Sequence, residues 1–262
     1  MQAIAKIILF GEHSVVYGKK ALAIPIKELK IRVKKQKEKC MQDEHLEYIK
    51  GLLNIKDYIK VISSIPISRG LGSSAALSVA LARLEGANEF EISNQAEIKA
   101  HGNPSGIDTA VIINEKALIF QKGKENIYLD IDLNAYVVII DTGIKSSTKE
   151  AVQLVNRLNR IDIIENLGDI TEKAIYKIFA KDIYAVGKLM KQAQSNLKQL
   201  KLSNSFLDRI IRKANYNSLG SKITGSGLGG CIISLCKNKN QARKLTKKIL
   251  KEGVSNFWIV RV

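Results

Sequence analysis

Residues 66–76 of this 262-residue chain read Pro66-Ile67-Ser68-Arg69-Gly70-Leu71-Gly72-Ser73-Ser74-Ala75-Ala76. Glycine permits positive φ and a close approach of the backbone to a ligand, so these glycines predict a turn in which N–H groups converge. Two serines then open a helix, whose first N–H groups and positive dipole end face the same point. That geometry suits a polyphosphate. Taken alone, the motif could also be an ordinary turn with a serine N-cap.

The pattern outside this loop predicts an α+β protein. The helix at 73–84 is almost entirely apolar, so we expect it to be buried. In the first half we expect strands at 4–10, 14–17, 21–34, 58–65, 109–121 and 136–141, and further helices at 45–53 and 91–100. In the second half we expect helices through 147–215, broken at Gly168 and Asn204, then strands at 222–225, 231–236 and 257–262 and a helix at 241–251. This change from mixed strands and helices to a mainly helical pattern predicts two domains, 1–141 and 142–262.

The composition indicates a globular protein, because 45% of the residues are hydrophobic. No apolar run reaches the ~20 residues that a membrane-spanning helix needs. The first ten residues are interrupted by Lys6 and lack the pattern of a signal peptide. The three cysteines cannot all pair with one another, and none has metal-ligand spacing with a histidine. A reducing cytoplasm is the simplest location for such a chain.

The net charge of +17 raises the question of nucleic-acid binding. The lysines are scattered and interleaved with acids, as in the segment 34–39, and few aromatic residues accompany them to stack on bases. A solvated lysine surface is the better interpretation, so we expect no nucleic-acid partner. A positive field would also attract anionic nucleotides and carboxylates.

A second glycine-rich stretch, Gly225-Ser226-Gly227-Leu228-Gly229-Gly230, formally matches the dinucleotide-binding pattern. That fingerprint follows a first strand and opens a helix, whereas this one comes late and runs into the apolar, strand-like segment 231–235. We therefore reject a dinucleotide site and expect a glycine-rich hairpin, either structural or pressed against the phosphate loop. No P-loop string occurs in the chain.

The segment 97–108 carries the candidate acid–base chemistry. Glu97 lies in a predicted helix, which enters a turn rich in Gly, Asn and Pro that delivers Asp108 at a strand start. A carboxylate held beside a rigid turn suits a hydroxyl-activating base. The alternative is a turn whose Asn and Asp bond only to backbone. Lys6 lies in an otherwise apolar strand, which predicts an aspartate partner because a buried lysine is costly unless it is paired.

These stretches together resemble the GHMP small-molecule kinases, and the similarity runs from residue 6 to about 236. The strings Gly11-Glu12-His13-Ser14-Val15-Val16-Tyr17-Gly18 and His101-Gly102-Asn103-Pro104-Ser105-Gly106-Ile107-Asp108 are most similar to those of members that phosphorylate mevalonate. The resemblance implies the two-domain GHMP kinase fold, with a left-handed βαβ N-terminal domain and a ferredoxin-like C-terminal domain. It also implies ATP and Mg²⁺ as cofactors, mevalonate as the small-molecule substrate, and an active site between the domains.

The resemblance also implies a role for individual residues. Asp108 would be the catalytic base and Lys6 would sit beside it and the substrate hydroxyl, keeping Asp108 ionised. Glu12 and His13 would lie on the substrate side, and Ser74 and Glu97 would bind Mg²⁺. The residues expected to bind ATP are Pro66, Arg69, Gly70, Leu71, Gly72, Ser73, Ser74, Ala75, Thr148 and Gly227.

Some features depart from the family pattern and leave alternatives open. Arg69 stands where small residues are more usual and could contact phosphate or be solvated, and Leu228 interrupts a run that is usually glycine or alanine. The acceptor could be a different alcohol, as in homoserine- or phosphomevalonate-type kinases. A protein of another class, binding RNA on a related scaffold, is the remaining alternative, and a homodimer is left open.

Overall fold

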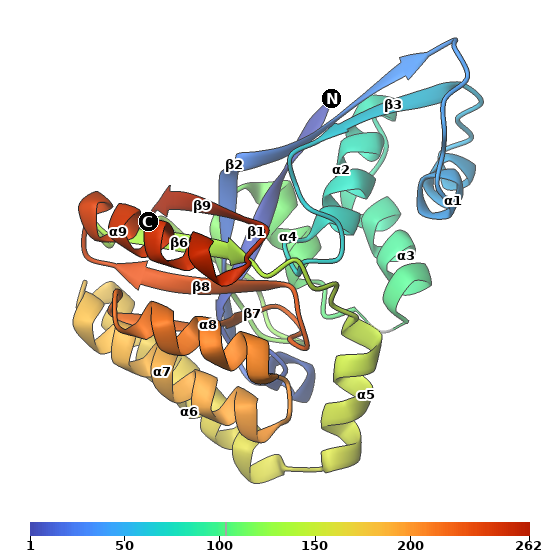
Figure 1. Ribbon diagram of the computed structural model, residues 1–262. Coiled ribbons are helices and arrows are strands. Elements are labelled where there is room, and N and C mark those ends of the chain that lie inside the picture. The colour runs from blue at the N-terminus through green and yellow to red at the C-terminus, as the bar shows by residue number, and fades with distance from the viewer. Residues whose placement is uncertain (103) are drawn as a thin grey trace. The chain divides into compact units, whose positions relative to one another are not determined.

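The computed structural model describes residues 1–102 and 104–262, so Asn103 of the predicted turn lies outside the described residues. The described chain forms two compact units (Figure 1). The first contains Met1–Ile7, Ala23–Ile67 and Leu71–Leu118, and the second contains Ile8–Leu22, Ser68–Gly70 and Ile119–Val262. Because both units are discontinuous in sequence, the chain passes between them several times.

The elements follow the hydrophobic pattern and its turn signals. Up to residue 120 they are β1 (Gln2–Phe10), the 3₁₀ helix η1 (Ser14–Tyr17), β2 (Ala21–Gln36), α1 (Glu44–Leu52), β3 (Tyr58–Ser63), α2 (Ser73–Glu85), α3 (Glu89–His101), α4 (Ile107–Asn114) and β4 (Ala117–Phe120). After it they are β5 (Ile127–Leu129), β6 (Tyr136–Asp141), α5 (Thr148–Leu158), α6 (Ile161–Phe179), α7 (Ile183–Gln199), α8 (Ser205–Asn215), β7 (Gly220–Thr224), β8 (Cys231–Cys236), α9 (Lys239–Ile249), the 3₁₀ helix η2 (Leu250–Glu252) and β9 (Asn256–Arg261).

The first unit is organised around the buried helix α2. Its residues 75–82 are all buried, which confirms the prediction from their apolar sequence. Helices α1, α3 and α4 pack against it. Strands β2 and β3 form an antiparallel pair with Ile31 opposite Ser63 and Gln36 opposite Tyr58, and α1 lies in the connection between them. Among the described residues, the sheet to which this pair belongs has the order β1-β2-β4-β5, with β3 on β2.

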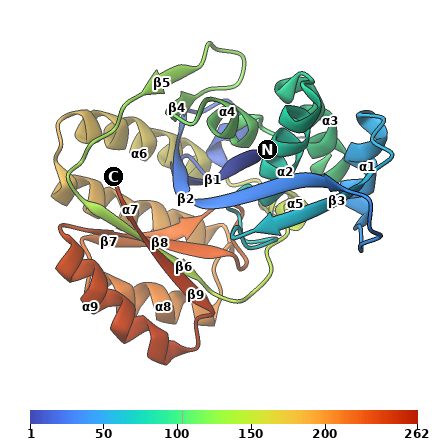
Figure 2. The same cartoon turned by 90° about the horizontal axis from the view of Figure 1, so that it is seen from above.

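The second unit is built on an antiparallel sheet of order β7-β8-β6-β9 among the described residues. Helices α8 and α9 pack against this sheet (Figure 2). Helix α7 lies against the edge strand β7, where Gly187 and Gly220 meet backbone to backbone and leave no space for a Cβ atom. The side-chain oxygen of Gln194 in α7 also accepts a hydrogen bond from the edge-strand N–H of Ile223, 2.9 Å away.

Three of the expected elements are wrong. Residues 14–17 form a short 3₁₀ helix rather than a strand, ended by Gly18 in the left-handed conformation. Residues 107–114 form α4, so only 117–120 of the predicted strand 109–121 is extended. The β-branched residues of α4 favour a strand locally, but their packing against α2 and α3 outweighs that preference. Gly168 lies inside α6, where a Cβ would meet the side chain of Lys19, so close packing explains this glycine.

The remaining predicted elements are present, with ends that differ by a few residues, and the expected break at Asn204 separates α7 from α8, which Asn204 caps. The predicted domain division at 141 remains a prediction. No helix among the described residues is long and apolar enough to cross a membrane. Cys40, Cys231 and Cys236 are free cysteines.

Candidate active site

Lys6 and Asp108 form an ion pair in the first unit. Lys6 Nζ lies 2.9 Å from Asp108 Oδ1, and the Lys6 side chain is 2% exposed whereas that of Asp108 is 30% exposed. Strand β1 buries the lysine among apolar residues, so the pairing predicted from its position is present. The charge pair therefore has one buried cation and one carboxylate that solvent or a substrate can reach.

Asp108 is the second residue of α4 rather than the start of a strand. The helix begins after Gly106, which is in the left-handed conformation and gives no side-chain cap. A carboxylate in the first turn of a helix is stabilised by the positive end of the helix dipole. Both this dipole and the Lys6 ammonium place positive charge beside the Asp108 side chain.

The glycine-rich loop lies against Lys6. The Lys6 N–H donates a hydrogen bond to the Leu71 carbonyl oxygen, 3.1 Å away. A Cβ on Gly72 would come within 3.2 Å of Cγ and Cε of Lys6, and Gly72 has a φ of +76°. Only glycine combines this conformation with this close approach. Leu71 and Gly72 of the loop therefore lie directly beside Lys6 within the first unit.

The loop ends at the start of α2, whose N-cap Gly72 makes no side-chain hydrogen bond. The first N–H groups of this helix are consequently not capped by that residue, and they carry the partial positive charge that attracts anions. Ser73 and Ser74 are partly exposed in the first turn, and Ala75 is buried behind them. The turn and the helix start that the sequence predicts are present, and their binding of phosphate remains a prediction.

The two candidate metal ligands come from neighbouring helices of the first unit. Ser74 is in the first turn of α2 and Glu97 is buried in α3, and the two helices pack against each other. Ser74 Oγ lies 2.8 Å from Nε2 of His45 on α1. In the described part of the chain, no three His, Cys, Asp or Glu side chains form a group that could hold a metal ion. A metal bound here would need oxygens from the substrate as well.

Glu12 and His13 lie in the second unit, in a buried polar network. The Glu12 carboxylate pairs with the Lys222 ammonium, and both side chains are almost inaccessible to solvent. His13 Nε2–H donates to the Ser226 carbonyl oxygen, 2.9 Å away. Burial lowers the pKa of His13 to about 4, the hydrogen bond to Ser226 opposes this, and the Lys222 charge lowers it further. His13 is therefore neutral at pH 7. The Glu12 carboxylate is one half of a buried ion pair.

The glycine-rich stretch 225–230 joins β7 to β8 as an antiparallel hairpin, as expected. Gly225, Gly227, Leu228 and Gly230 all have positive φ, which leucine adopts at a conformational cost. A Cβ on Gly227 would come within 2.8 Å of the Leu202 carbonyl oxygen. Within the second unit, a Cβ on Gly70 would come within 3.2 Å of the Thr224 carbonyl oxygen, so the start of the phosphate loop lies against this hairpin.

The other residues expected to bind ATP have different surroundings. Arg69 donates from Nε to Asp141 Oδ1 at 2.8 Å and from a terminal nitrogen to the Gly143 carbonyl oxygen at 2.9 Å, so its guanidinium has structural partners. Thr148 is exposed at the start of α5, and Pro66 is partly buried before the loop. Their roles toward ATP remain predictions.

Two residues of these networks, Lys222 and His45, are given no role by the sequence reasoning. Lys222 gives the same signal as Lys6, since it is a lysine inside an apolar strand. His45 lies in a polar helix and its contact depends on the packing of α1 against α2, so no local signal reveals it.

Family profiles match both halves of the chain. The profile for the GHMP kinases N terminal domain matches residues 33–116, and the profile for the GHMP kinases C terminal matches residues 172–255. The chain belongs to the GHMP kinases. The two-domain α+β fold expected for this family is thereby confirmed, and the protein is a small-molecule kinase that uses ATP.

The relatives of this GHMP kinase are similar over almost their whole length. A mevalonate kinase of Thermococcus gammatolerans is 32% identical over 90% of this chain and 88% of the relative. One of Pyrococcus furiosus is 30% identical over 90% of this chain and 89% of the relative. The crystal structure of the Methanococcus jannaschii mevalonate kinase aligns with a TM-score of 0.83 and 27% identity, covering 100% of this chain and 97% of that one.

Proposed function

We propose that this GHMP kinase phosphorylates mevalonate, transferring the γ-phosphoryl group of ATP to its 5-hydroxyl group to give 5-phosphomevalonate. The relatives named as mevalonate kinases support the acceptor. One structural observation supports the chemistry above all others: a solvent-reachable carboxylate, Asp108, is paired with a buried ammonium, Lys6, directly beside the glycine loop.

In this proposal Asp108 accepts the proton of the acceptor hydroxyl. The oxygen forms a bond to the γ-phosphorus as the bond to the β,γ-bridging oxygen breaks, and ADP leaves. Phosphoryl transfer depends mainly on positioning and on stabilisation of charge. Lys6 would stabilise the negative charge that develops on the acceptor oxygen, and the N–H groups at the start of α2 would bind the phosphates.

The residues at the site fit ATP and Mg²⁺. Gly72 has a positive φ and no Cβ, which leaves room for the Lys6 and Ile112 side chains beside the loop, and the helix that follows offers N–H groups to an anion. Mg²⁺ prefers oxygen ligands and is usually held by one or two carboxylates together with substrate phosphates. Ser74 and Glu97 are both oxygen donors and would hold the ion. When bound, Mg²⁺ would neutralise charge on the phosphates.

The buried network of the second unit is proposed to contribute to the acceptor side. His13, neutral because its pKa is about 4, would present a polar group without adding charge. Glu12 would act through its pairing with Lys222, keeping the Gly11–His13 turn in place. Glu12 and His13 stay proposed substrate-side residues, with Glu12 in a supporting role.

We also propose a cytoplasmic location, because the free cysteines include two buried thiols. Burial raises the pKa of Cys236 to about 12 and raises that of Cys231 as well, so neither thiol is reactive. A homodimer stays an expectation, and cell fractionation and sedimentation would test these two points.

A panel of acceptors tests the proposed function. Purified protein with Mg²⁺ and ATP would be offered mevalonate, phosphomevalonate, homoserine or galactose, and ADP release would be followed by a coupled assay. Turnover on mevalonate with little on the other three supports the proposal. Turnover on another alcohol and none on mevalonate would show that the protein is a kinase but that the proposed acceptor is wrong. RNA binding without any kinase activity would contradict both the proposed reaction and the proposed acceptor.

A further inference from the structure

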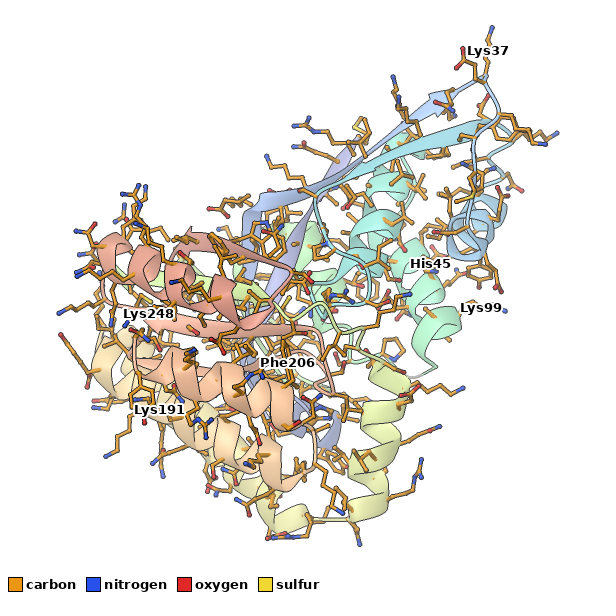
Figure 3. All side chains as sticks on the ribbon, in the orientation of Figure 1. Lys37, His45, Lys99, Lys191, Phe206 and Lys248 are labelled. Carbon is orange, nitrogen blue, oxygen red and sulfur yellow. The ribbon has the colours of Figure 1, made fainter. Side chains whose placement is uncertain are left out.

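Among the side chains that the structure describes, the imidazole of His45 lies beside a proposed metal ligand, Ser74. Its Nε2 atom lies 2.8 Å from Ser74 Oγ, which is hydrogen-bonding distance for a hydroxyl and a ring nitrogen. His45 is the second residue of α1, and Figure 3 labels it there, together with Lys99 on α3. The imidazole therefore approaches Ser74 from a separate helix.

Helix α1 is fixed at its start. Asp43 caps it by accepting from the Leu46 N–H, 2.8 Å away. Gln42 just before it bonds the backbone of Ile59 in both directions, donating to the carbonyl oxygen at 2.9 Å and accepting from the N–H at 3.2 Å. These hydrogen bonds connect the start of α1 to β3, so the backbone position of His45 is fixed.

The body of α1 is fixed against the helices that carry the two proposed metal ligands. Leu46 and Ile49 are buried, and α1 packs against both α2 and α3. Lys99 Nζ of α3 lies 5.8 Å from the centre of the Tyr48 ring of α1, a cation–π distance. The position of the imidazole relative to Ser74 is thus set by packing rather than by the local sequence.

A serine hydroxyl can be a metal ligand only when a lone pair of its oxygen faces the ion. The Ser74 hydroxyl has one proton and two lone pairs, and its rotation decides where each of them points. If the proton is donated to Nε2 of a neutral imidazole, both lone pairs stay available to a cation. Removing a partner that orients a metal ligand typically lowers the affinity for the metal by about 10–100-fold.

We infer that His45 is a positioning residue for the metal–nucleotide complex: its Nε2 accepts the Ser74 hydroxyl proton and so directs the Ser74 oxygen at Mg²⁺. The inference rests on the proposed function, because it takes Ser74 as a ligand of the ion. It adds α1, a segment outside the glycine loop, to the parts of the chain that determine metal affinity.

Matched substitutions separate the hydrogen bond from the bulk of the side chain. His45→Gln keeps an acceptor oxygen near the place of Nε2, whereas His45→Leu keeps volume without an acceptor. Glu44→Gln, at an exposed neighbouring position on α1, is the control. Each variant would be titrated with Mn²⁺, detected by electron paramagnetic resonance, in the presence of a non-hydrolysable ATP analogue. Melting temperatures without ligand would report any damage to the fold.

We expect His45→Leu to weaken Mn²⁺ binding by about 10-fold and His45→Gln by no more than about 3-fold, with the control at the wild-type value. Mn²⁺ binding to His45→Leu as tight as to wild type would overturn the inference. Equal losses in His45→Leu and His45→Gln at unchanged melting temperature would also overturn it, because the acceptor atom would then be irrelevant.

Ser74→Ala, measured in parallel, distinguishes this inference from the proposed function. If Ser74→Ala weakens Mn²⁺ binding and His45→Leu does not, only the inference fails. If Ser74→Ala leaves Mn²⁺ binding unchanged, the metal assignment fails and the inference with it. In the double variant, His45→Leu should add less than a further 2-fold to the loss caused by Ser74→Ala, because both changes remove the same ligand.

Discussion

Lys6 and Asp108 lie 2.9 Å apart with very different exposure, 2% for the lysine side chain and 30% for the aspartate. The carboxylate therefore pairs with a buried cation and stays within reach of a substrate hydroxyl. Their positions also mean that the two partners do not contribute equally to stability.

We expect Asp108→Ala to destabilise the fold more than Lys6→Met does. Removing the aspartate takes away one of the groups that balance a buried ammonium, whereas removing the lysine leaves a carboxylate that water can reach, so the first change should cost more. The double variant should recover most of the loss. Urea unfolding of the three variants measures this, and a larger loss for Lys6→Met than for Asp108→Ala would contradict it.

Ser74→Ala and Glu97→Gln should each raise the Mg²⁺ concentration needed for half-maximal activity. The Ser74→Ala substitution should change the stability of the fold little, because Ser74 is only partly buried. A rise of about 10-fold or more is expected if each residue supplies one oxygen to the ion. Activity measured as a function of Mg²⁺ at saturating ATP tests this, with Glu91→Gln, at an exposed position on α3, as the control. Unchanged Mg²⁺ dependence would remove the residue in question from the metal site.

His13 should make stability depend on pH. Its pKa is about 4 in the folded protein against 6.5 for an ordinary histidine, so between these values the unfolded chain binds a proton that the folded chain does not. The contribution, about 3 kcal/mol, is present above pH 6.5 and is lost progressively as the pH falls to 4. Urea unfolding at pH 7, 6, 5 and 4 measures it.

The control for that experiment is His13→Asn, since asparagine also tolerates the positive φ of 61° at this position. The variant should show a flatter dependence between pH 6.5 and 4. The same slope in both proteins would mean that His13 does not titrate as its burial indicates.

Lys222→Met should be strongly destabilising, because it leaves the Glu12 carboxylate buried without the ammonium that balances it. Breaking a buried pair from one side typically costs about 3–5 kcal/mol. Lys222→Met combined with Glu12→Gln should recover part of this free energy, since no buried charge then remains in the pair. Denaturant unfolding of the single and double variants provides the test. A single variant as stable as wild type would contradict this account of the pair.

The residues proposed for catalysis could be singled out where a single residue carries a physical signal. A lysine in an apolar strand requires a partner, so the Lys6–Asp108 pair could be expected, and the glycines of 70–72 could be recognised as a ligand-binding turn. The same argument applied to Lys222 would have predicted a buried acid, but it could not name Glu12, which is 210 residues away.

The errors arose where packing outweighs local preference. The β-branched residues of 107–114 indicate a strand, yet they form α4 because they pack against two other helices. His45 shows the same limit, since its contact with Ser74 exists only after α1 has packed against α2. Figure 3 labels two exposed lysines on separate elements, Lys191 on α7 and Lys248 on α9, and the absence of a nucleic-acid partner remains a prediction.

The most direct test is ADP release with mevalonate as the sole acceptor, measured for the wild-type protein and for Asp108→Ala. We predict turnover by the wild type and a loss of about 10²–10⁴-fold in the variant, with ATP-analogue binding nearly intact. A variant that keeps more than about a tenth of wild-type turnover would contradict the account, because Asp108 could not then be the base.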